Sequence, residues 1–168
     1  GYILKYSEAT PMDVNLGILT ADGYNTHKLA CFVELFEIAY ERLNQENGRD
    51  AKSYSKAPHS FGNHLKRLNE HRLLRSFWLE GVLIGCYLIE GSYITDIVIH
   101  PKYQNNGYGS IILMHCIRFM RMEKGISDIY LRITSSNKGA KRLYERHGFL
   151  AISHFAEHTY TLPFFNRM

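Results

Sequence analysis

The chain has 168 residues, of which 45% are hydrophobic and 21% are charged, and its formal net charge is +4. This length and balance exclude a disordered chain and predict a single globular domain over residues 1–168. The net charge suits a small anionic ligand, but it is too low to indicate nucleic acid as a partner.

No apolar run reaches the length of a membrane-spanning helix, and no charged-then-apolar leader opens the chain. We therefore expect a cytoplasmic protein without a membrane partner. The cysteines Cys31, Cys86 and Cys116 have no paired spacing and leave one thiol over. We expect all three to be reduced, with Cys31 and Cys116 buried because both lie in apolar helical runs.

The first part of the chain predicts a strand, a helix and a polar segment. Residues 2–6 alternate as an opening strand, and an apolar helical stripe begins near Leu29 and ends near Asn44. Glutamates occupy the opposite side of that helix, where we expect a solvated face. The polar run 44–58 has no periodicity, and long loops in compact domains tend to be functional or mobile. A short second helix is predicted around Leu65.

The second part of the chain alternates between strands and helices. Strands are predicted over residues 73–79, 82–89, 93–100, 129–134, 149–155 and 159–164, and helices over 110–124 and 137–147. Gly85, inside the second of these strands, predicts a bulge or a close backbone approach. The elements together predict an α/β domain with a mixed, mostly antiparallel sheet of about seven strands and about four helices.

A turn with two glycines joins the strand 93–100 to the next helix. It consists of Gln104, Asn105, Asn106, Gly107, Tyr108, Gly109 and Ser110. The first N–H groups of a helix have no intrahelical partner, and the helix dipole places partial positive charge there. Glycine allows a positive φ and a close approach by a ligand. The turn therefore predicts a cradle for an anion such as a diphosphate.

Two familiar nucleotide motifs do not fit this turn. A P-loop requires four residues between its glycines and a following Gly-Lys-Ser/Thr, which the chain lacks. A dinucleotide fingerprint requires a third glycine, but Ile112 stands in its place. Because many helices begin after a glycine turn and bind nothing, the turn alone does not decide the function.

A second motif follows the strand 129–134. Asn137, Ala140 and Tyr144 are spaced by three and four and so share one face of a helix that Gly148 ends. The two motifs, in this order and at this separation, resemble those of the GNAT superfamily of acetyl-CoA-dependent N-acetyltransferases. The turn matches Gln/Arg-x-x-Gly-x-Gly/Ala, and the helix matches Asn-x-x-Ala-x-x-x-Tyr-x-x-x-Gly-Phe. The resemblance covers roughly residues 79–152.

The resemblance implies a GNAT-like fold and an activity. The activity would be transfer of an acetyl group from acetyl-CoA to the primary amine of a small molecule or peptide, by direct attack in a ternary complex without a metal. Residues 79–152 would form the coenzyme-binding core, and residues 20–72 would set acceptor specificity, with 44–58 as a substrate lid. A non-catalytic acyl-CoA-binding or regulatory module is the alternative. The oligomeric state stays open between monomer and homodimer.

The resemblance also assigns residues to the coenzyme. The turn amides would hold the diphosphate, the strand backbone near Val98 would pair with the pantetheine arm, and Asn137 would line the other side. The full set is Ile97, Val98, Ile99, Gln104, Asn105, Asn106, Gly107, Tyr108, Gly109, Ser110, Asn137, Ala140 and Tyr144. The family often has a basic residue where this chain has Asn106, which predicts modest coenzyme affinity unless positive charge comes from elsewhere.

Acetyl transfer requires that the amine lose a proton. A lysine-like amine is protonated at neutral pH, and its deprotonation costs about 4–5 kcal/mol. Asp96 is the first candidate for the base, because an unpaired acid inside an apolar strand would be costly. Thr95 could occupy the same register instead, Glu90 and His100 are weaker candidates, and a purely local pairing of Asp96 stays open.

The leaving thiolate must gain a proton, and Tyr144 is the candidate acid. A phenol has a pKa of about 10, close to the basicity of a thiolate. The alternative is a core aromatic residue that packs under the sheet. Cys86 and Cys116 are poor nucleophile candidates because no acid–base partner lies near either in sequence.

Two further patterns carry less weight. Residues 154–158 spell the zinc-protease-like H-x-x-E-H, but that motif works on a helix and this segment predicts strand and turn, so we expect no metal. The basic residues of the helix 137–147 form a single patch, which suits the coenzyme phosphates or an ordinary surface better than nucleic acid.

Overall fold

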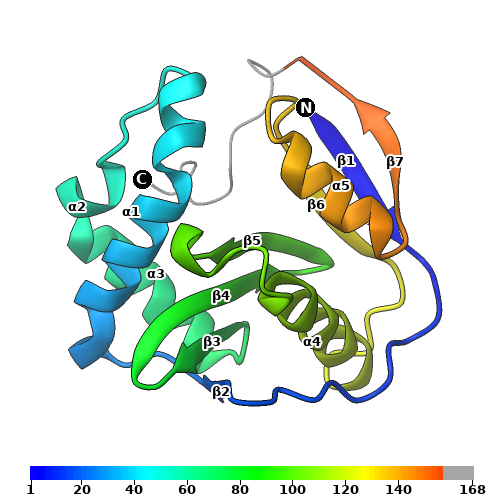
Figure 1. Ribbon diagram of the computed structural model, residues 1–168, viewed down its shortest axis with the longest axis horizontal. Coiled ribbons are helices and arrows are strands. Elements are labelled where there is room, and N and C mark those ends of the chain that lie inside the picture. The colour runs from blue at the N-terminus through cyan, green and yellow to red at the C-terminus, as the bar shows by residue number, and fades with distance from the viewer. Residues whose placement is uncertain (157–168) are drawn as a thin grey trace.

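The computed structural model describes residues 1–156, and its centre is one seven-stranded sheet (Figure 1). The strands lie in the order β2-β3-β4-β5-β6-β1-β7. They are β1 (Tyr2–Tyr6), β2 (Thr20–Asp22), β3 (Leu74–Leu79), β4 (Val82–Glu90), β5 (Tyr93–Ile99), β6 (Ile129–Ile133) and β7 (Phe149–His154). Every neighbouring pair is antiparallel except β5 and β6, which run parallel. The predicted mixed, mostly antiparallel sheet is confirmed.

Helices cover both faces of this sheet. They are α1 (Leu29–Glu46), α2 (Ser53–Lys56), α3 (Pro58–Glu70), α4 (Tyr108–Met122) and α5 (Lys138–Arg146), with short 3₁₀ helices η1 (Thr26–Lys28) and η2 (Pro101–Tyr103). Figure 1 shows α1, α2 and α3 grouped on one side of β3–β5, and α4 and α5 on the other. Two separate buried clusters match this division, one beneath α1–α3 and one beneath α4 and α5.

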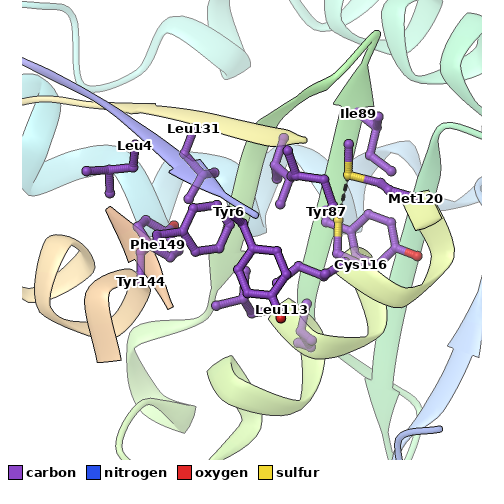
Figure 2. Packing of buried hydrophobic residues seen from close by; sticks show 14 of the residues in the cluster. Leu4, Tyr6, Tyr87, Ile89, Leu113, Cys116, Met120, Leu131, Tyr144 and Phe149 are labelled. Carbon is purple, nitrogen blue, oxygen red and sulfur yellow. Dashed lines mark hydrogen bonds between the residues drawn. The ribbon is translucent and has the colours of Figure 1, made fainter. Parts of the chain in front are cut away.

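The cluster beneath α4 and α5 contains side chains from both ends of the chain. Leu4 and Tyr6 of β1 meet Leu113 of α4, Tyr144 of α5 and Phe149 of β7, and all five are at most 5% exposed (Figure 2). Full burial of each such side chain contributes about 1.5–3 kcal/mol relative to exposure. The first strand and the last described strand are therefore part of the core that carries α5.

The glycine inside β4 marks a close approach, as predicted. A Cβ on Gly85 would lie 2.5 Å from Cδ1 of Ile112 and 3.1 Å from the carbonyl oxygen of Val98. The β3–β4 register also shifts between Phe77 and Trp78, beside Gly85. The close approach is confirmed, because α4 packs directly against this point of the sheet, and the register shift places a bulge beside Gly85.

Several predictions differ from the structure. Strand β2 was not predicted, because three residues are too short to show alternation; β2 pairs only at the edge, with β3. The polar run 44–58, predicted as a long loop without periodicity, contains α2, whose Tyr54 is 3% exposed. The prediction that Cys31 is buried is wrong, because neighbouring Phe32 takes the inward position in the first turn of α1 and leaves Cys31 exposed. The predicted strand 159–164 lies outside the described residues.

The sheet opens between its two parallel strands. Strands β5 and β6 pair only at Tyr93 with Tyr130 and at Ile94 with Leu131, so the remaining residues of β5 run on without a β6 partner among the described residues. The β4–β5 register also shifts, because Leu88 pairs with Asp96 while the next residue pairs with Ile94. This leaves Thr95 as the extra residue of a β-bulge at the point of separation. The two strands thus splay apart beyond Ile94 and Leu131.

Candidate active site

The turn after β5 has the backbone that an anion cradle requires. Gly107 is the residue that precedes α4 and has a left-handed φ of 80°, and Asn105 has a φ of 65°. Helix α4 begins at Tyr108, two residues earlier than predicted, and its first turn therefore directs N–H groups toward the turn. A Cβ added to Gly109 would lie 3.5 Å from Cδ2 of Leu143, which is ordinary contact. Packing thus does not require glycine at this position, whereas a close-lying ligand would.

A cleft of about 790 Å³ begins at this turn, beside the separated strands. It is bordered by β5, the turn, one side of α5 along its length and one side of α1. The predicted site residues that line it are Ile97, Val98, Ile99, Gln104, Asn105, Gly107, Gly109, Ser110, Asn137, Ala140 and Tyr144. The two motifs, although about 30 residues apart in the sequence, therefore meet across one cleft.

Three predicted site residues do not line this cleft: Asn106, Tyr108 and Asp96. The amide nitrogen of Asn106 donates to the carbonyl oxygens of Tyr103 and Gln104 at 3.2 and 3.0 Å, so this side chain stabilises the turn itself. Tyr108 is the first residue of α4 and lies partly buried outside the cleft lining.

Positive charge reaches the cleft from α5. Lys138, Arg142 and Arg146 are among the lining residues, as is Arg42 of α1, and Glu46 is the one acidic residue in the described lining. This excess of cations favours an anionic ligand. It also supplies the charge that the turn lacks at Asn106.

Tyr144 is part of the buried core and also borders the cleft. It is 5% exposed, its ring centroid is 5.9 Å from that of Phe149, and its side chain borders the cleft. Among the described residues, none accepts a hydrogen bond from its hydroxyl. Burial, with a smaller contribution from the charge of Asp96, raises the pKa of Tyr144 above its usual value. The phenol is therefore protonated at neutral pH.

The bulge at Thr95 directs Asp96 toward α1. The hydroxyl of Tyr40 donates to Oδ1 of Asp96 at 2.8 Å. The hydroxyl of Thr95 instead donates to the carbonyl oxygen of Leu88 at 3.2 Å. The charge of Asp96 contributes, after burial, to the raised pKa values of Tyr40 and Cys86. The carboxylate thus lies among weak acids that stay neutral.

The two weaker candidates for the base make contacts elsewhere. Glu90 pairs with Arg67 of α3, with 2.8 Å between the carboxylate oxygen and Nη2. Nδ1 of His100 accepts a hydrogen bond from the backbone N–H of Lys102 at 3.1 Å, which caps η2. Neither residue is among those that line the cleft.

Sequence reasoning missed two residues that shape this site. Tyr40 belongs to α1, whose apolar stripe gives no indication that it meets a carboxylate 56 residues away. His147 follows α5, and its Nε2 lies 2.8 Å from the hydroxyl oxygen of Ser110 in the first turn of α4. Burial, and then the charge of Arg146, lower the pKa of His147, so a neutral imidazole holds the two helices together at neutral pH.

The described residues contain no group of three or more His, Cys, Asp or Glu side chains that could hold a metal ion. Of the H-x-x-E-H pattern, the structure describes only the first histidine, His154, which stacks on Tyr2 with a centroid distance of 4.6 Å. Within residues 1–156, no helix is both long and apolar enough to cross a membrane.

Comparison with known proteins identifies the family. The model of the Acetyltransferase (GNAT) family matches residues 32–149, which is more than half of the chain. The chain belongs to this family. A curated relative, the ribosomal protein bS18-alanine N-acetyltransferase of Haemophilus influenzae, is 32% identical over 96 residues. That match covers 55% of this chain and 64% of the relative, so it spans less than two thirds of the relative's length.

Solved GNAT structures share the fold at low identity. The PaiA N-acetyltransferase from Thermoplasma acidophilum in complex with coenzyme A has a TM-score of 0.71 and 15% identity, with 82% of this chain and 93% of that chain covered. AAC(6')-Iy in complex with the bisubstrate analogue CoA-S-monomethyl-acetylneamine has a TM-score of 0.61 and 14% identity, with 82% and 95% covered. The resemblance seen in the two sequence motifs is thus confirmed at the level of family and fold.

Proposed function

We propose that the protein is an acetyl-CoA-dependent N-acetyltransferase that acts on a primary amine of a small molecule or peptide. The observation that carries this proposal is that the glycine turn and the Asn137 helix, the two family motifs, line one cleft at the separation of β5 and β6. Relatives named as N-acetyltransferases, and family members solved with coenzyme A or a bisubstrate analogue, support the reaction class.

The coenzyme would lie along the cleft in an extended form. Its diphosphate would meet the backbone N–H groups of the turn from Asn105 to Ser110, at the start of α4. Its pantetheine amides would pair with the backbone around Val98, where β5 has left β6. Arg142 and its basic neighbours on α5 would balance the phosphate charge. Residues 79–152 thus act as the coenzyme-binding part of a single domain.

The reaction proceeds by direct attack. The nitrogen of the deprotonated amine forms a bond to the acetyl carbonyl carbon, and the carbon–sulfur bond breaks as the intermediate collapses. The leaving thiolate takes the hydroxyl proton of Tyr144, which is neutral and borders the cleft. Asp96 holds the proton that the ammonium gives up before attack, and the second proton, which the nitrogen loses as the amide forms, returns the Tyr144 oxygen to its hydroxyl form.

A covalent acyl-enzyme is not part of this scheme. Cys86 and Cys116 are both fully buried, and burial raises the pKa of each thiol well above its usual value. A thiol that is neutral and sealed from the cleft is a poor nucleophile. Attack by the acceptor amine in a ternary complex is therefore the simplest route.

The test is a panel of amines incubated with acetyl-CoA and the purified full chain. The panel contains peptides with a free α-amine, peptides with a lysine side chain, a polyamine and an aminoglycoside, and the readouts are free thiol release and the mass of the acceptor. We expect thiol release that depends on one class of amine and adds one acetyl group to it. Calorimetric uptake of acetyl-CoA without turnover on any amine would instead favour the non-catalytic module. Folded protein that takes up no acetyl-CoA would refute both.

A further inference from the structure

The proposed base does not reach the cleft directly. Tyr40 of α1 lines the cleft, whereas Asp96 is not among its lining residues. The Tyr40 hydroxyl donates to Oδ1 of Asp96 at 2.8 Å. We infer that Tyr40 carries the proton of the acceptor amine to Asp96, an inference that rests on the proposed acetyl transfer.

The ring of Tyr40 is held in place by other aromatic side chains. It stacks on Tyr54 of α2 with a centroid distance of 6.2 Å and an interplanar angle of 22°, and its centroid is 6.1 Å from that of Phe36. Tyr54 is in turn 3% exposed, and its ring centroid lies 4.9 Å from that of Phe61 in α3. Three helices thus fix the direction of the Tyr40 hydroxyl toward the bulge of β5.

Other weak acids also lie within electrostatic reach of the Asp96 carboxylate. The charge of Asp96 raises the pKa of Tyr54, Cys86 and Tyr144 as well as that of Tyr40, and burial is the largest cause for each. These groups come from α2, β4, α5 and α1, so weak acids that stay neutral face Asp96 from four elements. The charge of Arg49 acts in the opposite direction on Tyr54 and lowers its pKa.

The proton transfer is balanced and needs no tyrosinate. One N–H proton of the acceptor ammonium moves to the Tyr40 oxygen while the Tyr40 hydroxyl proton moves to Oδ1 of Asp96. The phenol is neutral before and after, the ammonium becomes a neutral amine, and the carboxylate becomes a carboxylic acid. A free tyrosinate at this position would be costly, because burial and the charge of Asp96 raise the pKa of Tyr40 well above its usual value. The two protons must therefore move together.

The arrangement also separates the two proton transfers of the reaction. Tyr40 lies on α1 and takes a proton from the acceptor, whereas Tyr144 lies on α5 and gives one to the thiolate. Both tyrosines border the cleft, and Asp96 lies between α1 and the sheet. The acceptor amine is accordingly expected to enter on the α1 side.

The first test compares Tyr40→Phe, Asp96→Asn and the double variant, with the amine found in the panel as substrate. We expect each single change to lower kcat/KM for the amine by about tenfold or more at neutral pH, with coenzyme affinity unchanged. The kcat/KM of the double variant is expected to be no lower than that of the less active single variant, because the two residues act in one path. Tyr6→Phe is the matched control, since it removes a phenol hydrogen bond of 2.6 Å to the Ala9 carbonyl away from the cleft.

A pH profile separates proton transfer from a structural role. The deficit of Tyr40→Phe is expected to shrink as the pH approaches the pKa of the acceptor amine, because the substrate then arrives deprotonated. A deficit that is the same at every pH, losses that add in the double variant, or full activity of Tyr40→Phe would each overturn the relay while leaving the acetyltransferase proposal intact. An inactive wild type would instead remove the proposed function itself.

A measurement on the unaltered protein covers the case in which Tyr40→Phe does not fold. The rate with subsaturating amine is followed in mixtures of light and heavy water. Two protons moving together give a curved dependence of kcat/KM on the deuterium fraction, which is the expected result. A straight line would mean that one proton moves and that Tyr40 is not in the path.

Discussion

Replacing Tyr144 with phenylalanine removes one oxygen from the site and leaves the packing almost unchanged. The side chain is 5% exposed and contacts Phe149, and these apolar contacts are retained by phenylalanine (Figure 2). The hydroxyl has no hydrogen-bond partner among the described residues, so its loss breaks no described hydrogen bond within the protein. The free energy of unfolding is therefore expected to change by less than about 1 kcal/mol.

The catalytic effect of the same change is expected to be much larger. A positioned acid typically contributes about 10²–10⁴ in rate, which corresponds to about 2.7–5.4 kcal/mol in the activation free energy. We expect a fall in kcat of at least about tenfold, allowing for a water that partly replaces the phenol. Coenzyme affinity should hardly change, because the turn and α5 are the proposed source of the phosphate contacts.

The assay measures kcat by thiol release, coenzyme affinity by calorimetry and stability by thermal unfolding of the same preparation. Wild-type turnover in Tyr144→Phe would refute the role of the phenol as the acid. A lost activity that is matched by lost coenzyme binding or a lowered unfolding temperature would show that the residue is only part of the core. The raised pKa of Tyr144 adds a second expectation, because the acid should stay protonated beyond pH 10.0 and give no alkaline loss of activity below that pH.

Three further changes test the geometry around the cleft. Gly109→Ala should weaken coenzyme binding by about tenfold or more and leave the unfolding temperature equal or higher, because alanine is about 1 kcal/mol better than glycine inside a helix and packing leaves room for a Cβ. Gly85→Ala should cost about 1–3 kcal/mol of stability through its clash with Cδ1 of Ile112, and adding Ile112→Val, which removes that atom, should restore most of the loss. The lowered pKa of His147 means that the unfolded chain binds more protons below about pH 6.5, so the stability from neutral His147 is complete above that pH and lost as the pH falls through the folded pKa. Thermal unfolding at about pH 7.5 and 5.5 should show a smaller difference for His147→Gln than for the wild type, and equal differences would contradict this linkage.

The elements that the sequence predicted well are those with local determinants. Helix α5 has Asn137 at its start, whose side chain accepts from the Ala140 N–H at 3.3 Å, and Gly148 after its end with a φ of 102°. The turn before α4 was recognisable because Gly107 adopts the left-handed conformation that glycine tolerates. In both places a few adjacent residues determine the backbone, so the pattern could be read without knowledge of the rest of the fold.

The elements that the sequence missed depend on contacts between distant segments. Strand β2 exists because Thr20 pairs with Trp78, and α2 is held by Tyr54 among the aromatic residues of α1 and α3. The exposure of Cys31 depends on which side of α1 meets the sheet, which a generally apolar run does not specify. None of these outcomes follows from periodicity over a short window.

The choice between Thr95 and Asp96 shows why a catalytic base is hard to read from a sequence. Side chains alternate along a regular strand, so regular alternation would place these two residues on opposite faces. The bulge at Thr95 interrupts the alternation, and the bulge becomes visible only when β4 and β5 are paired. The Tyr40 hydroxyl at 2.8 Å then gives Asp96 a connection to the cleft that its own position on β5 does not provide. The proposed base therefore depends on one irregularity in a strand together with one helix, and the substitution of Tyr40 tests that combination directly.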